Sequence, residues 1–374
     1  MIGRLKFEFN NLVNQILDQI PEELLINGTV LDPSIGGGQF VKEVERRKRA
    51  AGKTDAEIAS TVFGIEENVL RKNYAVNKNN LVGSYSVAKY LEKDFNMKFD
   101  VIIGNPPYQK PKTETRLGSR GDTSLWDKFV VKSLDNLNDN GYFAFIHPNS
   151  WRKPDDRNNF WKLLTQDNQM HQLVMSSGKR DQDWFGIGVR VDYYILQKTP
   201  KYKNTIVIDH ENVRYDLDLA NFNWLPNYAI NEISQLLGKD LKVLYNTFYH
   251  TQKKHCDSSN ATFKYPVVHT INQQGLGIKY FDRVPEENNI HIGVPKVLLN
   301  QNELQYPYND YKGEYGMSQL TFGIPISSKE EGDTIVEFLN SDKGKRIIAA
   351  TKWNTYYTDY GMFNYFRKDF YKND

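Results

Sequence analysis

The chain has 374 residues, of which 39% are hydrophobic and 25% charged, and its 48 basic and 46 acidic side chains leave a net charge of +2. This length predicts two domains, or one domain with a large extension, and a charge so near zero gives no argument for nucleic-acid binding. Cys256 is the single cysteine, which excludes an intramolecular disulfide and a cysteine zinc cluster. No apolar run is long enough to span a membrane, so we expect a soluble protein with no membrane partner. The single cysteine favours a cytoplasmic location, and we expect no bound metal.

The first predicted elements lead to a glycine-rich loop. Apolar side chains at helical spacing predict an amphipathic helix over residues 5–20, and a short apolar strand follows at 29–31. The chain then runs Asp32-Pro33-Ser34-Ile35-Gly36-Gly37-Gly38 and enters a predicted helix over 40–49. Glycines let a ligand approach the backbone closely at the amino end of that helix.

The glycine loop by itself is a weak signal. A dinucleotide site is one alternative, but Phe40 and Val41 stand where the G-x-G-x-x-G pattern has its third glycine. The acid at Asp32 also favours a ligand with a positive group over a pyrophosphate. A second apolar strand over 61–65 ends at Glu66, which is placed to accept hydrogen bonds from a ribose diol.

The most informative stretch is the third predicted strand and the turn that ends it. Three consecutive β-branched apolar residues, 101–103, predict a buried parallel strand, and Asn105-Pro106-Pro107-Tyr108 follows at its carboxyl end, where ligands bind in open α/β sheets. Asn105 can donate and accept hydrogen bonds, the Pro106 carbonyl accepts, and Tyr108 offers a flat ring. This set suits a planar group that carries an amino function. The alternative is a buried strand that simply ends in a Pro-Pro turn.

In this order, the sequences DPSIGGGQF, GIEEN and FDVIIGNPPYQ resemble motifs I, II and IV of the S-adenosylmethionine-dependent N6-adenine DNA methyltransferases, in the Type II restriction-modification branch. The cofactor loop precedes the Asn-Pro-Pro-Tyr motif and a large remainder follows it, which is the gamma-group order of that family. The resemblance is clear over residues 28–198. It implies the class I S-adenosylmethionine-dependent methyltransferase fold, an α/β architecture with a doubly wound, mostly parallel sheet.

The resemblance also implies roles for individual residues, with S-adenosylmethionine as the cofactor. The residues implied to bind it are Asp32, Pro33, Ser34, Gly36, Gly38, Phe40, Glu66, Ser84 and Asn105. At Ser84 the chain departs from the family, which usually has an aspartate there to accept a hydrogen bond from the cofactor adenine. The implied catalytic motif is Asn105, Pro106, Pro107 and Tyr108, with Tyr108 stacked on the flipped base.

Beyond the motif, the segment 109–122 is polar and basic. We expect it either to contact DNA phosphates through Lys110, Lys112, Arg116 and Arg120 or to be a plain solvated loop. A helix over 125–137 and, over 141–151, a strand with an abrupt exit follow it, and His147 is expected to be structural. The segment 183–196 resembles motif VIII of the family, in which Phe185 would touch the extruded base; the alternative is that Phe185 is a core aromatic.

The alternation of helix and strand signals fades at Thr199, and a polar, Pro-containing link follows. We therefore expect a cofactor-binding and catalytic domain at 1–199 and a mixed, largely β target-recognition domain at 200–374, with helices over 330–339 and 343–350. Lys253 and Lys254 are a basic cluster that contacts the DNA backbone or forms a solvated loop. The aromatic tail after Trp353 either stacks on bases or packs against the domain.

The resulting expectation is an enzyme that methylates N6 of a flipped adenine in a specific double-stranded DNA sequence. The resemblance implies double-stranded DNA as the partner, a monomer, and a cognate restriction endonuclease as a further partner. Two alternatives stay open. One is a methyltransferase with the same motif that acts on RNA or on a protein glutamine, and the other is a non-catalytic DNA-binding protein with a methyltransferase fold.

Overall fold

The computed structural model divides into two compact units, Met1–Trp224 (unit 1) and Leu225–Asp374 (unit 2). It describes residues 2–66, 87–92, 97–109, 124–154, 159–176, 190–250, 253–284, 291–301, 306–353 and 360–372. The predicted site residues that lie outside these ranges are Ser84, Lys110, Lys112, Arg116, Arg120 and Phe185. Among the helices within them, none has the length and apolar character needed to cross a membrane.

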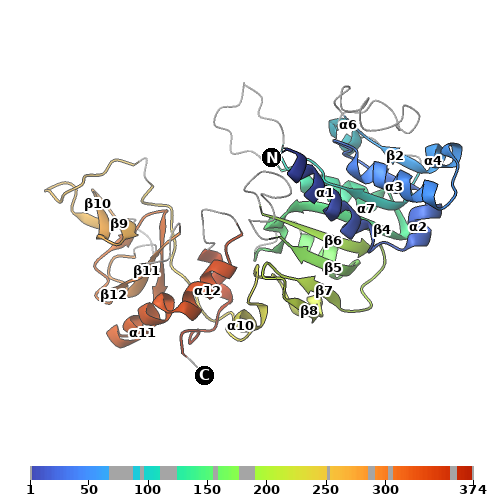
Figure 1. Cartoon of the computed structure of the whole chain (residues 1–374). Helices are drawn as coiled ribbons and strands as arrows, with labels where there is room; N and C mark the ends of the chain where they lie inside the picture. The colour runs from blue at the N-terminus through green and yellow to red at the C-terminus, as the bar shows by residue number, and fades with distance from the viewer. Residues whose placement is uncertain are drawn as a thin grey trace. The chain divides into compact units, whose positions relative to one another are not determined.

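Unit 1 is built on an eight-stranded sheet with the order β2-β1-β3-β4-β6-β5-β7-β8. Figure 1 labels β2, β4, β6, β5, β7 and β8 of this sheet. Its strands are β1 Val30–Asp32, β2 Val62–Gly64, β3 Phe99–Gly104, β4 Leu137–Pro148, β5 Gln169–Met175, β6 Val191–Gln197, β7 Thr205–Ile208 and β8 Arg214–Leu217. The strands β1 to β4 pair in parallel, whereas β6 is antiparallel to both of its neighbours, β4 and β5. The predicted mostly parallel α/β sheet is confirmed.

Helices cover this sheet and bury it. They are α1 Ile2–Leu17, α2 Glu22–Asn27, α3 Gln39–Ala50, α4 Asp55–Thr61, α6 Val87–Glu92, α7 Trp126–Asp135 and α8 Phe160–Thr165, with short 3-10 turns η1 Asn149–Arg152 and η2 Leu219–Asn221. One core cluster joins α1 and α3 to alternate strand residues such as Val30, Val101 and Ala144. The intervening residues Leu31 and Ile102 are buried as well and point to the opposite face, so both faces of the sheet are covered.

The boundary between the units differs from the predicted one. The sequence predicts it at 199/200, but the division falls between Trp224 and Leu225. The reason is that β7 pairs in parallel with β5 and β8 pairs with β7, which extends the sheet of unit 1 beyond the polar link. The short Thr205–Ile208 strand has too little periodicity to reveal this pairing in the sequence.

Unit 2 combines two three-stranded sheets, β10-β9-β13 and β12-β11-β14, with helices. Its elements are α10 Ile230–Ser234, β9 Tyr265–Asn272, β10 Gly275–Phe281, β11 Lys296–Asn300, β12 Tyr308–Asp310, β13 Gly316–Met317, β14 Thr321–Pro325, α11 Lys329–Asn340, α12 Asp342–Ala350 and η3 Tyr360–Tyr365. The mixed, largely β character and the two late helices match the prediction. Ser328 and Ser341 begin these helices by accepting hydrogen bonds from the backbone N–H groups of Glu331 and Gly344.

The aromatic tail packs into unit 2. Trp353, Phe363, Phe366 and Phe370 are each less than 5% exposed, and Phe363 and Phe370 contact each other edge to face. For these four side chains, packing rather than base stacking is the structural role.

Candidate functional site

Three neighbouring strands bring predicted site residues to one edge of the unit 1 sheet. β1 lies between β2 and β3, and in this register Asp32 pairs with Gly64. Asp32 ends β1, Glu66 follows β2, and Asn105 follows β3. Because the three strands are parallel, their carboxyl ends share this edge, as the order of the motifs predicted.

The glycine loop is held in place by hydrogen bonds to the turn after β2. The Ile65 N–H donates to the Asp32 carbonyl (2.9 Å), the Ile35 N–H donates to the Ile65 carbonyl (3.0 Å), and the Gly36 N–H donates to Glu66 Oε2 (2.8 Å). Gly36 and Gly38 have φ values of 55° and 77°, in the left-handed region that other residues rarely adopt. The loop therefore needs glycine at both positions, and Gly38 is the N-cap residue of α3, which begins at Gln39.

The loop also approaches β2 and β3 closely. A Cβ on Gly64 would lie 2.3 Å from Ile35 Cδ1, so that the Ile35 side chain occupies the space that a side chain at Gly64 would need. A Cβ on Gly104 would lie 3.0 Å from Asp32 Oδ1 and 3.4 Å from Ser34 Oγ. The end of the predicted catalytic strand and the start of the glycine loop are thus in direct contact.

Asp32 is a buried carboxylate with an unusual environment. It is 2% exposed, its Oδ1 accepts a hydrogen bond from the Ser34 N–H (2.9 Å), and no cation of the described chain forms an ion pair with it. Burial raises the pKa of Asp32 to about 7, the Ser34 hydrogen bond lowers it, and the nearby Glu66 carboxylate raises it. The Ser34 hydroxyl is buried and has no hydrogen-bond partner among the residues described.

The Asn-Pro-Pro-Tyr turn is closed by a side-chain hydrogen bond. The Tyr108 hydroxyl donates to Asn105 Oδ1 (2.9 Å), and the Tyr108 carbonyl accepts from the Leu125 N–H (3.1 Å). The Tyr108 ring is half-buried against the core cluster of unit 1. Since an amide oxygen has two lone pairs, this contact leaves Asn105 Oδ1 able to accept one more hydrogen bond.

Two other members of the predicted cofactor set have side chains in the interior. Pro33 is buried, and Phe40 is 3% exposed and meets Phe9 edge to face with ring centroids 6.3 Å apart. The Phe40 ring is therefore part of the core beneath α1.

A polar cluster at the ends of β4 and β6 was not predicted from the sequence. Arg152 Nε lies 2.6 Å from Asp192 Oδ2, both side chains are fully buried, and the Trp151 indole N–H donates to the same carboxylate oxygen (3.1 Å). Burial raises the pKa of Asp192, while Arg152 lowers it. The two partners lie 40 residues apart, so no local sequence pattern could have revealed the pair.

His147 is structural in this arrangement, as expected. Its ring nitrogens lie 3.0 Å from the Pro148 carbonyl and 3.0 Å from the Tyr194 hydroxyl, and its ring stacks on Trp126 at a centroid distance of 4.5 Å. Burial lowers the pKa of His147 to about 4, which keeps the imidazole neutral at physiological pH.

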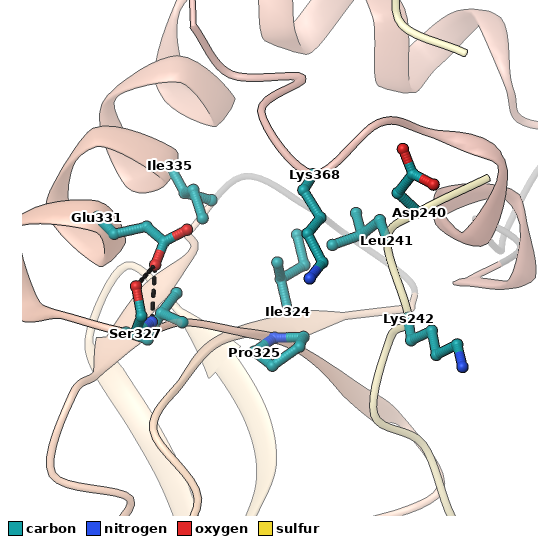
Figure 2. A pocket seen from close by; sticks show the side chains of 10 residues that line it. Asp240, Leu241, Lys242, Ile324, Pro325, Ser327, Glu331, Ile335 and Lys368 are labelled. Atoms are coloured by element: carbon teal, nitrogen blue, oxygen red, sulfur yellow. Dashed lines mark hydrogen bonds between the residues drawn. The ribbon is translucent and has the colours of Figure 1, made fainter. Parts of the chain in front are cut away.

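Unit 2 has a cavity of about 500 Å³ whose lining includes no predicted site residue. Figure 2 shows Glu331 accepting hydrogen bonds from Ser327 on one side, with Asp240, Lys242 and Lys368 on the other. Glu331 also accepts a hydrogen bond from the Tyr371 hydroxyl (2.9 Å). These bonds tie α11 to the end of β14 and to the tail, which indicates a structural role for this carboxylate.

Residues 38–181 match the model of the Eco57I restriction-modification methylase family. The chain is similar to the Type II methyltransferase M.AccI of Acinetobacter calcoaceticus, with 30% identity over 139 residues that make up 34% of this chain and 24% of that protein. It is also similar to the Type II methyltransferase M.HincII of Haemophilus influenzae, with 21% identity over 238 residues, 59% of this chain and 44% of the relative. The chain thus spans less than half the length of these curated relatives.

The fold has a counterpart among solved structures. The Type IIL restriction-modification enzyme MmeI, solved in complex with DNA, aligns with 92% of this chain and 62% of its own, with a TM-score of 0.51 and 13% identity. The sheet, with antiparallel β6 between β4 and β5, has the arrangement of class I methyltransferases. The matched part of the chain is thus similar to Type II restriction-modification methyltransferases, and the chain has the class I methyltransferase fold. S-adenosylmethionine is the methyl donor that this similarity and this fold imply.

Proposed function

We propose that this protein transfers the methyl group of S-adenosylmethionine to the N6 amino group of an adenine flipped out of a specific double-stranded DNA sequence. The observation that carries the proposal is the contact between the two motifs: Gly104, directly before Asn105, lies against Asp32 and Ser34 of the glycine loop. A donor held by the loop and an amine held by Asn105 would therefore meet at one point. In this proposal the protein acts as a monomer, with a cognate restriction endonuclease as a separate partner.

The residues of the glycine loop fit the methionine end of S-adenosylmethionine. That end carries positive charge, and Asp32 is a buried carboxylate that lacks a cationic partner in the described chain. The unpartnered Ser34 hydroxyl and the amino end of α3 offer hydrogen bonds to its carboxylate. Glu66 now accepts the Gly36 N–H through Oε2, and its carboxylate suits a ribose diol. When bound, the cofactor supplies an electrophilic methyl group.

The affinity for S-adenosylmethionine is expected to rise with pH up to about 7. Because the pKa of Asp32 is raised to about 7, half of the free protein carries a neutral carboxyl at that pH, and a cationic ligand favours the ionised form. Below this pKa the affinity should fall by up to about tenfold per pH unit. Calorimetric titration between pH 5.5 and 8.5 measures this change and the proton that binding releases.

Asp32→Asn is the control for this pH dependence. The variant should bind the cofactor weakly and with no change across pH 6 to 8, because its amide does not titrate. If the cofactor affinity of Asp32→Asn still changed with pH as it does in the wild-type protein, a group other than Asp32 would control the titration.

The catalytic end follows from the chemistry of the exocyclic amine, whose lone pair is delocalised into the ring. Asn105 Oδ1 and the Pro106 carbonyl would each accept one amine hydrogen, which favours the pyramidal, nucleophilic form of the nitrogen. Tyr108 would stack on the flipped base while its hydroxyl, bonded to Asn105 Oδ1, keeps the amide oxygen oriented. Most of the rate enhancement would come from positioning, since this transfer needs no strong base.

The direct test is expression in a host that lacks adenine methylation, followed by sequencing that detects N6-methyladenine in genomic DNA. The expected result is one sequence motif methylated at high occupancy. A folded protein that binds S-adenosylmethionine and leaves the DNA unmethylated would contradict the proposal and favour an RNA or protein glutamine substrate. A protein that does not bind the cofactor would favour a non-catalytic role.

A further inference from the structure

The strands β9 and β10 form an antiparallel hairpin in unit 2, the β9–β10 ribbon (Figure 1). On the other edge of β9, β13 pairs with Val267 and Val268, away from the tip of the ribbon. Asn272 pairs with Gly275, so the connecting loop consists of Gln273 and Gln274 alone. Asn272 Oδ1 accepts the Gln274 N–H (2.8 Å), and Gly275 has a φ of 113°. The shape of the tip is thus set by Asn272 and Gly275, and the two glutamine side chains are not needed to form it.

The glutamines at the tip are exposed and available. Both side chains lack a hydrogen-bond partner within the described residues, and both project from the end of the ribbon into solvent. A glutamine amide carries a donor and an acceptor side by side, which matches the N6 and N7 edge of adenine in the major groove. Near its tip, beyond the residues of β9 that pair with β13, the hairpin has two strands, and a two-stranded ribbon is one of the shapes that the major groove admits.

Basic side chains accompany the ribbon. Cys256 and Tyr280 exchange backbone hydrogen bonds of 3.0 and 2.8 Å, which brings the segment that holds Lys253 and Lys254 alongside β10. Lys264 directly precedes β9. Burial lowers the pKa of His269 on β9, and the neighbouring Lys279 and His255 lower it further. His269 therefore lies close to these basic side chains.

Three of these lysines are held by aromatic rings rather than by acids. The Nζ atom of Lys253 lies 4.0 Å from the centre of the Phe248 ring, and those of Lys254 and Lys264 lie 5.9 and 5.4 Å from the rings of Phe263 and Tyr265. In the described structure none of the three forms an ion pair, unlike Lys279, which pairs with Asp257. Their charges therefore stay available to an anionic partner.

The segment 253–283, which contains β9 and β10, has an excess of basic side chains. Residues 253–283 contain five basic and two acidic side chains, whereas residues 225–374 together contain 17 of each. The rest of the unit is consequently acidic. A polyanion would therefore be attracted to this segment more than to the rest of unit 2, although the net charge of the whole chain is close to zero.

We propose that the β9–β10 ribbon reads the DNA sequence from the major groove, with Gln273 and Gln274 contacting base edges and Lys253, Lys254 and Lys264 contacting phosphates. This inference rests on the proposed function, because it names the element that selects the methylated site. In this arrangement the exposed amides at the tip recognise bases. The three lysines that have no acidic partner position the protein on the DNA backbone.

The lysines are tested by the salt dependence of duplex DNA binding by the full chain, measured without turnover. Each phosphate contact contributes about 0.9 to the slope of log K against log salt, so Lys253→Ala/Lys254→Ala should reduce the slope by roughly two. The matched control is Lys343→Ala/Lys345→Ala, two exposed lysines of α12 in the same unit, which should leave the slope unchanged. Equal reductions in both variants, or no reduction in the first, would overturn the assignment.

The glutamines are tested by specificity. Gln273→Ala/Gln274→Ala should lower the affinity for the methylated motif on the order of 10- to 100-fold and relax one or two of its positions, with affinity for unrelated duplex DNA unchanged. Gln235→Ala, at an exposed glutamine in the same unit, is the control. An unchanged motif and affinity would refute base reading, and so would a loss confined to single-stranded DNA. If the wild-type chain methylates no DNA, the proposed function fails, while the salt experiment still decides whether the ribbon binds duplex DNA.

Discussion

Replacing Asn105 with alanine is expected to lower the rate of methyl transfer on the order of 10²- to 10³-fold or more, with little change in cofactor binding. The alanine removes the side-chain oxygen that would accept an amine hydrogen, and the Pro106 carbonyl cannot hold both. It also removes the acceptor of the Tyr108 hydroxyl, so the aromatic ring loses its link to the motif. Single-turnover methylation of a duplex that carries the motif measures the loss, and calorimetry measures cofactor affinity.

Asn221→Ala is a suitable control because Asn221 is an exposed asparagine in the same unit, and it should retain full activity. Asn105→Asp keeps an acceptor oxygen at this position and changes the charge. It therefore separates the effect of losing the acceptor from the effect of a changed charge. Full activity in Asn105→Ala would refute the assigned role, whereas an equal loss of cofactor affinity would place Asn105 mainly in the cofactor site.

Replacing Arg152 with alanine is expected to destabilise unit 1 by about 3–5 kcal/mol. The change leaves the buried Asp192 carboxylate without its cation, while the Trp151 indole N–H still donates to Asp192 Oδ2. A loss of that size is a large fraction of the roughly 5–15 kcal/mol that stabilises a typical domain. Hydrogen exchange of β4 and β6 amides under mild denaturant localises the loss to unit 1.

The matched control is the exposed pair of Lys162 and Asp167, whose side chains are 61% and 47% exposed. Lys162→Ala should change stability far less, because water screens both charges. Replacing both buried partners with apolar residues of similar size, Arg152→Met/Asp192→Leu, should recover much of the loss, since no unpaired charge then remains. A similar loss of stability in Arg152→Ala and Lys162→Ala would show that burial does not increase the contribution of the Arg152–Asp192 pair to stability.

The sequence predicted the parts of unit 1 whose signals are local. A run of three apolar residues predicted β3, and the glycines predicted the turn into α3; both lie where expected. Their meeting at one sheet edge followed from a general rule about parallel strands. The contact between Ile35 and Gly64 and the bond from Tyr108 to Asn105 could not be predicted, because they depend on side-chain packing and rotamers rather than on spacing.

Predictions failed where pairing is long-range or the signal is weak. The boundary at 199/200 relied on a polar segment containing Pro200, but a polar link can connect two strands of one sheet as readily as two units. The charge balance of the whole chain also concealed the basic ribbon, since the acidic remainder of unit 2 offsets it. The roles of Ser84 and Phe185 stay predictions.

The position of β6 has a consequence for how the chain folds during synthesis. β6 pairs with β4 on one side and β5 on the other, yet it is made after both. Until Gln197 leaves the ribosome, β4 is an open sheet edge bearing the apolar side chains of Phe143 and Phe145. At roughly 5–20 residues per second, the stretch from Pro148 to Gln197 takes on the order of 2–10 s to synthesise. During that interval the nascent chain presents an unpaired strand edge, which favours pairing with other chains.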